Sequence, residues 1–95
     1  MTAYLIGDVE VLDKVAYEEY RQKVPATITA YGGRYIARGG ATEVLEGDWV
    51  PKRCVLIEFP SMAQLKVWWE SPEYVPLRAI RQRATRSNLI ATEGL

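Results

Sequence analysis

The fold is decided by the stretch YGGRYIARGGATEVLEGDWVPKRCVLIEFP, which runs from Tyr31 to Pro60. Both of its ends predict β-strands, over residues 34–38 and 53–59, because apolar, aromatic and β-branched side chains recur there between glycine and proline punctuation. A long excursion, residues 39–52, separates the two strands. Within it, residues 42–46 are expected either to extend the first of these strands or to form a short hairpin arm, and the Gly39-Gly40 pair predicts a sharp turn or bulge.

The chain before this stretch predicts a strand followed by a helix. Residues 3–11 alternate between two faces, as a half-buried strand does. Asp13 stands where an N-cap belongs, ahead of apolar positions that recur every three or four residues on one stripe of a helix. The stripe consists of Tyr17, Tyr20, Val24, Ile28 and Tyr31. Pro25 interrupts it, and because proline inside a helix costs about 3 kcal/mol we expect a kink or a restart there.

The chain after Pro60 predicts two helical segments and a last strand. Ser61 and Gln64 form a capping-box pattern, in which the serine caps the helix and the glutamine reaches back. The sequence Ser71-Pro72-Glu73 predicts a helix restart that continues to about Arg83, and residues 87–93 read as a strand. The order is therefore β-α-β-β-α-β. It predicts the α+β class and a ferredoxin-like sandwich, with both helical segments on one face of a four-stranded antiparallel sheet.

Composition limits the function classes. Ninety-five residues, 48% of them apolar, indicate one folded domain, residues 1–95. Twelve basic residues balance twelve acidic ones, so we expect no nucleic-acid partner. The apolar run before Asp8 is too short for a signal peptide or membrane span, and a single cysteine, Cys54, is typical of a cytoplasmic protein. The chain has no histidine, the commonest general base and metal ligand, and we predict neither a metal nor a cofactor.

The sheet is predicted to be apolar on both faces. In the first strand Tyr4 and Ile6 lie opposite the face of Leu5 and Val9, and the strand 53–59 also has apolar residues on both sides. Helices on one face cannot cover the other, so we expect a twofold homodimer with sheets packed face to face. The alternative is a monomer whose second face is covered by the excursion.

Five motifs in order carry a family resemblance: YGGRY at 31–35, RGG at 38–40, LEGDWVP at 45–51, IEFPS at 57–61 and WWESPEY at 68–74. Together they resemble the small bacterial proteins of the domain-of-unknown-function 1330 family over nearly the whole chain. The resemblance implies the ferredoxin-like dimeric α/β-barrel superfamily. The family has no established activity. Relatives by fold include cofactor-free monooxygenases, muconolactone-isomerase-like enzymes and ligand-sensing domains, which is analogy at the level of fold.

The first candidate site is a set of arginines and carboxylates. Arg34 and Arg38 are expected on one face of their strand. Arg53 opens the neighbouring strand, and Glu58 is expected near the end of that strand, on the opposite face. Arg38 could grip a ligand carboxylate or enolate. Alternatively, it forms a structural ion pair with Glu46 or Glu58.

The second candidate site is aromatic. Its tyrosines are Tyr17, Tyr20, Tyr31, Tyr35 and Tyr74. A buried tyrosine hydroxyl needs a partner and could hold a ligand, although helical spacing also suits core and interface positions. Trp49 in the excursion suits either a pocket lid or a hook into a partner subunit. Of Trp68 and Trp69, one is expected in the core and one nearer the cleft.

Two classes of function fit a small-molecule cleft between sheet and helices. One is a cofactor-independent enzyme that acts on a small organic acid, lactone or oxidisable aromatic, in which Arg38 holds developing negative charge and Glu58 or a tyrosine is the acid or base. The other is a non-catalytic small-molecule binding or stress-response module. A third interpretation, a purely structural dimer, has no ligand. The basic run Arg78, Arg81, Arg83 and Arg86 is interpreted as a solvated face.

Overall fold

The computed structural model describes all residues, 1–95, and has the predicted element order. The elements are β1 (Ala3–Val11), α1 (Lys14–Ala30), β2 (Arg34–Arg38), β3 (Cys54–Phe59), α2 (Met62–Trp69), α3 (Val75–Ala84) and β4 (Thr85–Glu93). The strands form one antiparallel sheet in the order β2-β3-β1-β4. This is the predicted ferredoxin-like α+β arrangement. None of the three helices combines the length and apolar character needed to cross a membrane.

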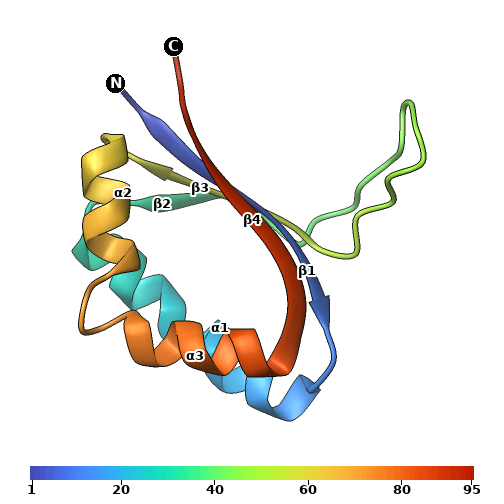
Figure 1. The fold of residues 1–95 in the computed structure, drawn as a ribbon, viewed down its shortest axis with the longest axis horizontal. Helices are drawn as coiled ribbons and strands as arrows, with labels where there is room; N and C mark the ends of the chain where they lie inside the picture. Colours follow the sequence, from blue (N-terminus) through green and yellow to red (C-terminus); the bar gives the residue numbers. More distant parts are fainter.

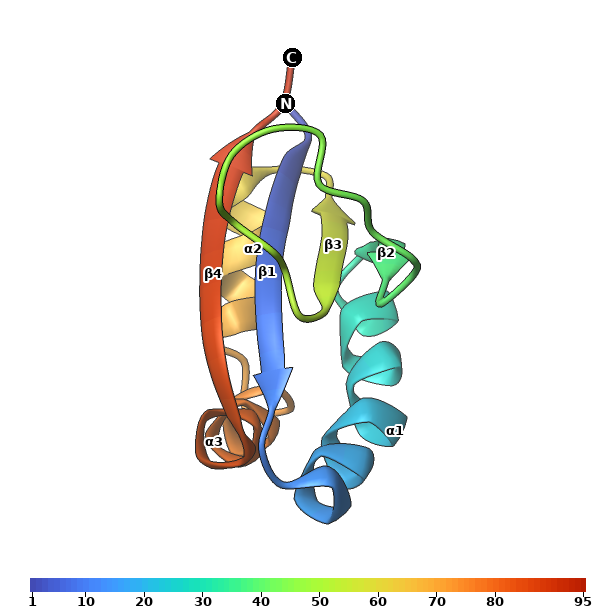
Figure 2. The same cartoon turned by 90° about the vertical axis from the view of Figure 1, so that its right-hand side faces the viewer.

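All three helices cover the same face of the sheet (Figures 1 and 2). We call this the helix face and the other the open face. The alternation of β1 sets the core, because Ala3, Leu5 and Val9 are buried toward the helices as predicted. They pack with the predicted stripe of α1 and with residues of β3, α2 and α3. The open face receives no helix.

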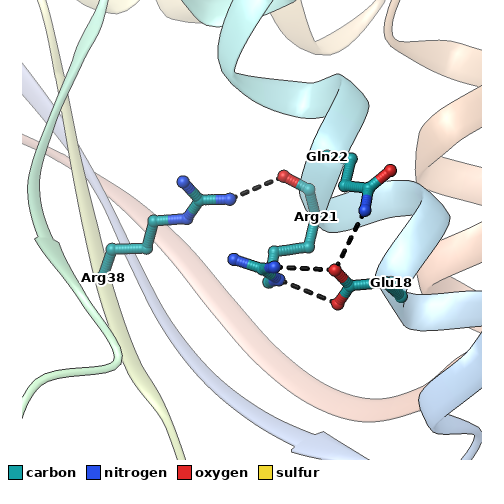
Figure 3. Close-up of polar contacts among 4 residues, drawn as sticks. All are labelled: Glu18, Arg21, Gln22 and Arg38. Carbon is teal, nitrogen blue, oxygen red and sulfur yellow. Dashed lines mark hydrogen bonds and ion pairs between the residues drawn. The ribbon is translucent and has the colours of Figure 1, made fainter.

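Helix α1 begins as predicted but does not restart at its proline. The carboxylate of Asp13 accepts a hydrogen bond from the backbone N–H of Ala16, which is an N-cap. The helix then continues through Pro25 without a break. Pro25 has no N–H for the carbonyl of Arg21, four residues earlier, and the guanidinium of Arg38 on β2 donates to that carbonyl instead, at 2.6 Å (Figure 3). A donor from another element therefore replaces the lost helical hydrogen bond.

Strand β2 contains an irregularity that the sequence did not predict. Arg34 pairs with Glu58 and Arg38 with Val55, and the register shifts around Ile36. The extra residue reverses the alternation, so Arg34 lies on the open face and Arg38 on the helix face. The expectation that the two arginines share a face is therefore wrong.

The segment between β2 and β3 contains neither a strand nor a hairpin, which corrects the prediction for residues 42–46. We call residues 40–52 the arm, because they rise from the open face and away from the body of the protein (Figures 1 and 2). No neighbouring strand lies beside residues 42–46 to complete a ladder of hydrogen bonds. Gly39, with φ of 69°, turns the chain into the arm.

The capping box of α2 is half formed. The Ser61 hydroxyl accepts from the backbone N–H of Gln64, as predicted. The Gln64 side chain does not reach back to Ser61; its Nε2 donates to the carbonyl oxygen of Tyr31 at 2.8 Å. It therefore ties the start of α2 to the end of α1.

We expect Gly33→Ala to lower the free energy of unfolding by about 1–3 kcal/mol, the usual range for overpacking. A Cβ at Gly33 would lie 2.6 Å from the ring of Phe59 and 2.9 Å from Cγ2 of Ile28. Gly40→Ala is the matched control, because a Cβ there has no neighbour within 4 Å. Urea unfolding of both variants measures the difference. Equal midpoints for the two would contradict the tight approach at Gly33.

Candidate functional site

The structure separates the predicted site residues onto the two sides of the sheet. Those on the helix side are Tyr20, Tyr35, Arg38, Arg53, Trp69 and Tyr74. Glu58 lies on the open face and forms an ion pair with Arg34 at 3.2 Å. Trp49 and Glu46 belong to the arm. Glu58 therefore cannot act as acid or base for a ligand held beside Arg38 between sheet and helices.

A pair of tyrosines forms the polar centre of the helix side. The hydroxyls of Tyr20 on α1 and Tyr74, just before α3, lie 3.0 Å apart. Both side chains are buried, and the ring of Tyr74 stacks on that of Trp68 with 3.9 Å between centroids. The stacking holds the Tyr74 hydroxyl in place, pointing toward α1. The sequence predicted both tyrosines as candidates, although it did not show that they meet.

Arg81 completes this centre, and sequence analysis missed it. Its side chain is only 4% exposed, and its Nε lies 3.5 Å from the Tyr74 hydroxyl. No carboxylate lies within ion-pair distance of its guanidinium. The interpretation of the basic run as solvated is therefore wrong at this position. Arg81 follows Leu77 by four residues and precedes Ala84 by three, so the helical spacing of these two apolar residues could have predicted its burial.

Trp69 connects this centre to the surface. The guanidinium carbon of Arg81 lies 5.8 Å from its ring centroid and that of Arg78 lies 4.9 Å away. Beyond Trp69, a groove of about 240 Å³ opens between α2 and β4. Its lining residues are Leu5, Leu65, Lys66, Trp69, Leu89, Ile90 and Ala91. The groove is apolar apart from Lys66, and its aromatic wall touches the buried arginine.

Strand β2 contributes a second, structural group. The reversed alternation places Arg38 beside Tyr35, with its guanidinium carbon 4.8 Å from the tyrosine ring centroid. Arg38 pairs with neither Glu46 nor Glu58, so the predicted ion pair is wrong. Its Nη2 donates to the carbonyl oxygen of Arg21, next to the local Glu18–Arg21 pair (Figure 3). This contact gives Arg38 a structural role.

Arg53 also lies on the helix side. Its guanidinium carbon is 5.8 Å from the ring centroid of Tyr17, and its Nε is buried without a hydrogen-bond partner. The guanidinium rests against the backbone of Gly39, where a Cβ would collide with it. A buried donor without a partner is destabilising, so this contact lowers the stability of the fold.

Burial shifts the pKa values of two tyrosines on the helix side. Burial, and then the neighbouring Tyr74, raises the pKa of Tyr20 far above its usual range. Burial also raises the pKa of Tyr35 to about 12, although Arg38 opposes the shift. Both hydroxyls are therefore protonated at neutral pH and can donate hydrogen bonds, but they are poor general bases. No group of three or more cysteine, aspartate or glutamate side chains is placed to hold a metal ion.

These features define a small α+β protein with a ferredoxin-like sheet and a buried arginine–tyrosine centre on its helix face. The sequence matches the domain of unknown function DUF1330 over residues 2–95, and the chain belongs to this family. No curated protein matches it.

Three solved structures show the same fold. RPA0582 from Rhodopseudomonas palustris, a protein of unknown function, is 21% identical, with a TM-score of 0.80 over 99% of this chain and 82% of that one. A dimeric ferredoxin-like protein of unknown function from Jannaschia sp. CCS1 is 12% identical, with a TM-score of 0.68 over 99% and 100%. SnoaB from Streptomyces nogalater, a cofactor-independent oxygenase, is 10% identical, with a TM-score of 0.66 over 99% and 93%. At these identities the likeness concerns the fold alone.

We expect Arg38→Ala to lower the free energy of unfolding by about 1 kcal/mol, because it leaves the Arg21 carbonyl without a donor. In a Pro25→Ala background the restored N–H can bond that carbonyl, so the same substitution should cost much less. A double-mutant cycle by urea unfolding measures this coupling. Arg34→Ala, on the open face of the same strand, is the control and should show no coupling to Pro25. An equal cost of Arg38→Ala in both backgrounds would refute the replacement of the helical hydrogen bond.

Stability should fall at alkaline pH, in part through Tyr35. Its folded pKa of about 12 exceeds the ordinary value of 10.0 expected after unfolding. The folded state therefore holds this proton more tightly, so the stabilisation is complete below pH 10 and is lost between pH 10 and about 12. We expect Tyr35→Phe to show a shallower decline in the free energy of unfolding over that interval. Urea titrations at several pH values compare the slopes, and identical slopes would contradict the burial of this hydroxyl.

Proposed function

We propose that this chain binds a small planar organic anion at Arg81, with the hydroxyls of Tyr20 and Tyr74 as further donors. The observation that carries this proposal is the buried guanidinium without a carboxylate partner. Removing a cation from water costs several kcal/mol unless a counter-ion is supplied. An anion that reaches Arg81 would supply it, whereas a purely structural role would be served better by an apolar side chain.

The chemistry of the centre favours a particular class of anion. A guanidinium matches the oxygen geometry of a carboxylate, and it also suits the oxygen of an enolate or phenolate. The tyrosine hydroxyls are donors at neutral pH, which fits the same oxygens. Trp69 and the apolar groove beside it suit a flat, apolar body. The groove is smaller than the usual ligand pocket, so a small aromatic or unsaturated acid, or a lactone that forms an enolate, fits best.

Catalysis is a second candidate. A guanidinium and two hydroxyl donors that bind an enolate or phenolate also stabilise the negative charge on which cofactor-independent oxygenation depends, and SnoaB is such an oxygenase. Tyr20, which stays protonated at neutral pH, cannot remove the substrate proton efficiently. A substrate for this site would therefore have to ionise readily by itself, as an acidic enol or an enolic lactone does. Non-catalytic binding requires no such condition, which makes it the simpler function.

We also propose a homodimer through the open face. Ile90 on this face is 61% exposed. Tyr4 and Ile6 lie on the neighbouring strand β1, and Leu56 pairs with Ile6 from the other side, on β3. The helices cannot cover these residues, since all three pack on the other face. The structure from Jannaschia is described as dimeric, which supports the same assembly here.

We expect a thermal-shift screen of small aromatic acids, aliphatic acids, lactones and hydroquinones to identify ligands. A ligand at a hundred times its Kd adds about 2.7 kcal/mol, a shift of several degrees for a domain of this size. Arg81→Met should abolish the shift without lowering the Tm of the unliganded protein, because it replaces an unpaired buried charge by an apolar chain of similar length. Arg83→Met, at an exposed position of the same helix, is the control and should keep the shift.

Two results would count against this function. Ligand shifts that survive in Arg81→Met would place the site elsewhere. A large fall in the Tm of Arg81→Met, with no ligand found for the original chain, would make Arg81 a structural residue and favour a structural dimer. Oxygen consumption with each ligand then separates catalysis from binding, because a binder consumes none.

A further inference from the structure

The arm exposes apolar side chains that nothing in the protomer covers. Leu45 is 92% exposed, and Trp49 and Val50 are each more than half exposed. A single exposed leucine is ordinary, but a cluster of large apolar residues on one short projecting segment is typical of an interaction surface. In Figure 1 the tip of the arm stands away from the sheet, and Figure 2 shows the arm arching in front of the open face.

The base of the arm is held in a defined position. The carboxylate of Asp8 on β1 accepts hydrogen bonds from Nε1 of Trp49 at 2.9 Å and from the backbone N–H of Lys52 at 2.8 Å. Because Asp8 lies on the open face, these bonds fix the direction in which the arm leaves the sheet. A surface that is already ordered loses less conformational entropy when it binds a partner.

The fixed arm also creates a socket on the open face. Trp49 stands as one wall of a half-open cavity of about 280 Å³, whose floor is formed by Ile6, Gly7 and Ile90. This socket faces the same side as the apolar residues of the proposed dimer interface. A second sheet packed on the open face would close it and fill it with apolar side chains.

The charge of the arm indicates what kind of partner it binds. The arm contains Glu43, Glu46 and Asp48 and no basic residue before Lys52. None of the three carboxylates forms an ion pair within the protomer. Since acidic and basic residues balance over the whole chain, the rest of the protein has an excess of positive charge. The arm is therefore complementary to the body of a second copy, and the same charge disfavours an anionic membrane surface.

We infer that the arm clasps a second copy of this chain, with Leu45 packed on the partner subunit and the socket beside Trp49 closed by it. The inference rests on the proposed homodimer and adds to it a second contact surface. In a twofold dimer each arm binds the opposite subunit, so every arm contact occurs twice. This inference favours the interpretation of Trp49 as a hook into the partner subunit over its interpretation as a pocket lid.

The test compares Leu45→Asp with Val15→Asp by sedimentation velocity over a concentration series. Val15 is the matched control, because it is also apolar, is 86% exposed and lies on α1, away from the open face. Neither substitution removes a buried contact, so both variants should fold. We expect Leu45→Asp to raise the dimer Kd at least tenfold and Val15→Asp to leave it unchanged.

A third variant, Ile90→Asp, separates the arm from the sheet interface. A weaker dimer in Ile90→Asp, together with an unchanged Kd in Leu45→Asp, would overturn the clasp and leave the homodimer intact. An original chain that stays monomeric at every concentration would overturn both. Binding of the monomer to anionic lipid vesicles that is lost in Leu45→Asp would equally overturn the clasp, because the occupant of the arm would then be a membrane.

Discussion

The structure depends on one asymmetry: a four-stranded sheet with three helices on one face and none on the other. Alternation along each strand then sends neighbouring side chains into two different environments. Residues such as Leu5 meet the helices and the arginine–tyrosine centre. Their neighbours along the strand, such as Ile6, lie on the open face and line the socket beside the arm. The candidate ligand site and the candidate subunit interface are therefore on opposite sides of a single layer of backbone.

Two local irregularities decide which residues reach the helix side. The register shift in β2 reverses the alternation and brings Tyr35 and Arg38 to the same face. Pro25 removes a hydrogen bond from α1, and Arg38 is then close enough to replace it. The two irregularities are matched, because without the shift Arg38 would face away from the helix that needs its donor. Arg38, which the sequence suggested as a ligand-binding residue, therefore stabilises the fold. The buried arginine without a carboxylate partner is Arg81.

Much of the fold could be predicted because its signals are local. Asp13 and Ser61 cap helices through residues three positions away, and the stripe of α1 depends only on helical spacing. The site could be predicted only in part. Tyr20 and Tyr74 were candidates, but their contact spans 54 positions of the chain. The partnership of Arg38 with Glu58 was wrong because the shift in β2 reverses the alternation and puts Arg38 on the helix face, away from Glu58.

The sequence by itself determined the class of fold, the order of the elements, the family and the face of β1 that forms the core. These follow from spacing and capping, which depend on near neighbours along the chain. Only the tertiary structure decided which face Arg38 occupies, that Arg81 is buried without a counter-ion, and that Asp8 on β1 anchors the arm. Each of these features depends on contacts between segments that are far apart in the chain. The free energies of such contacts cannot be read from the local pattern of residues.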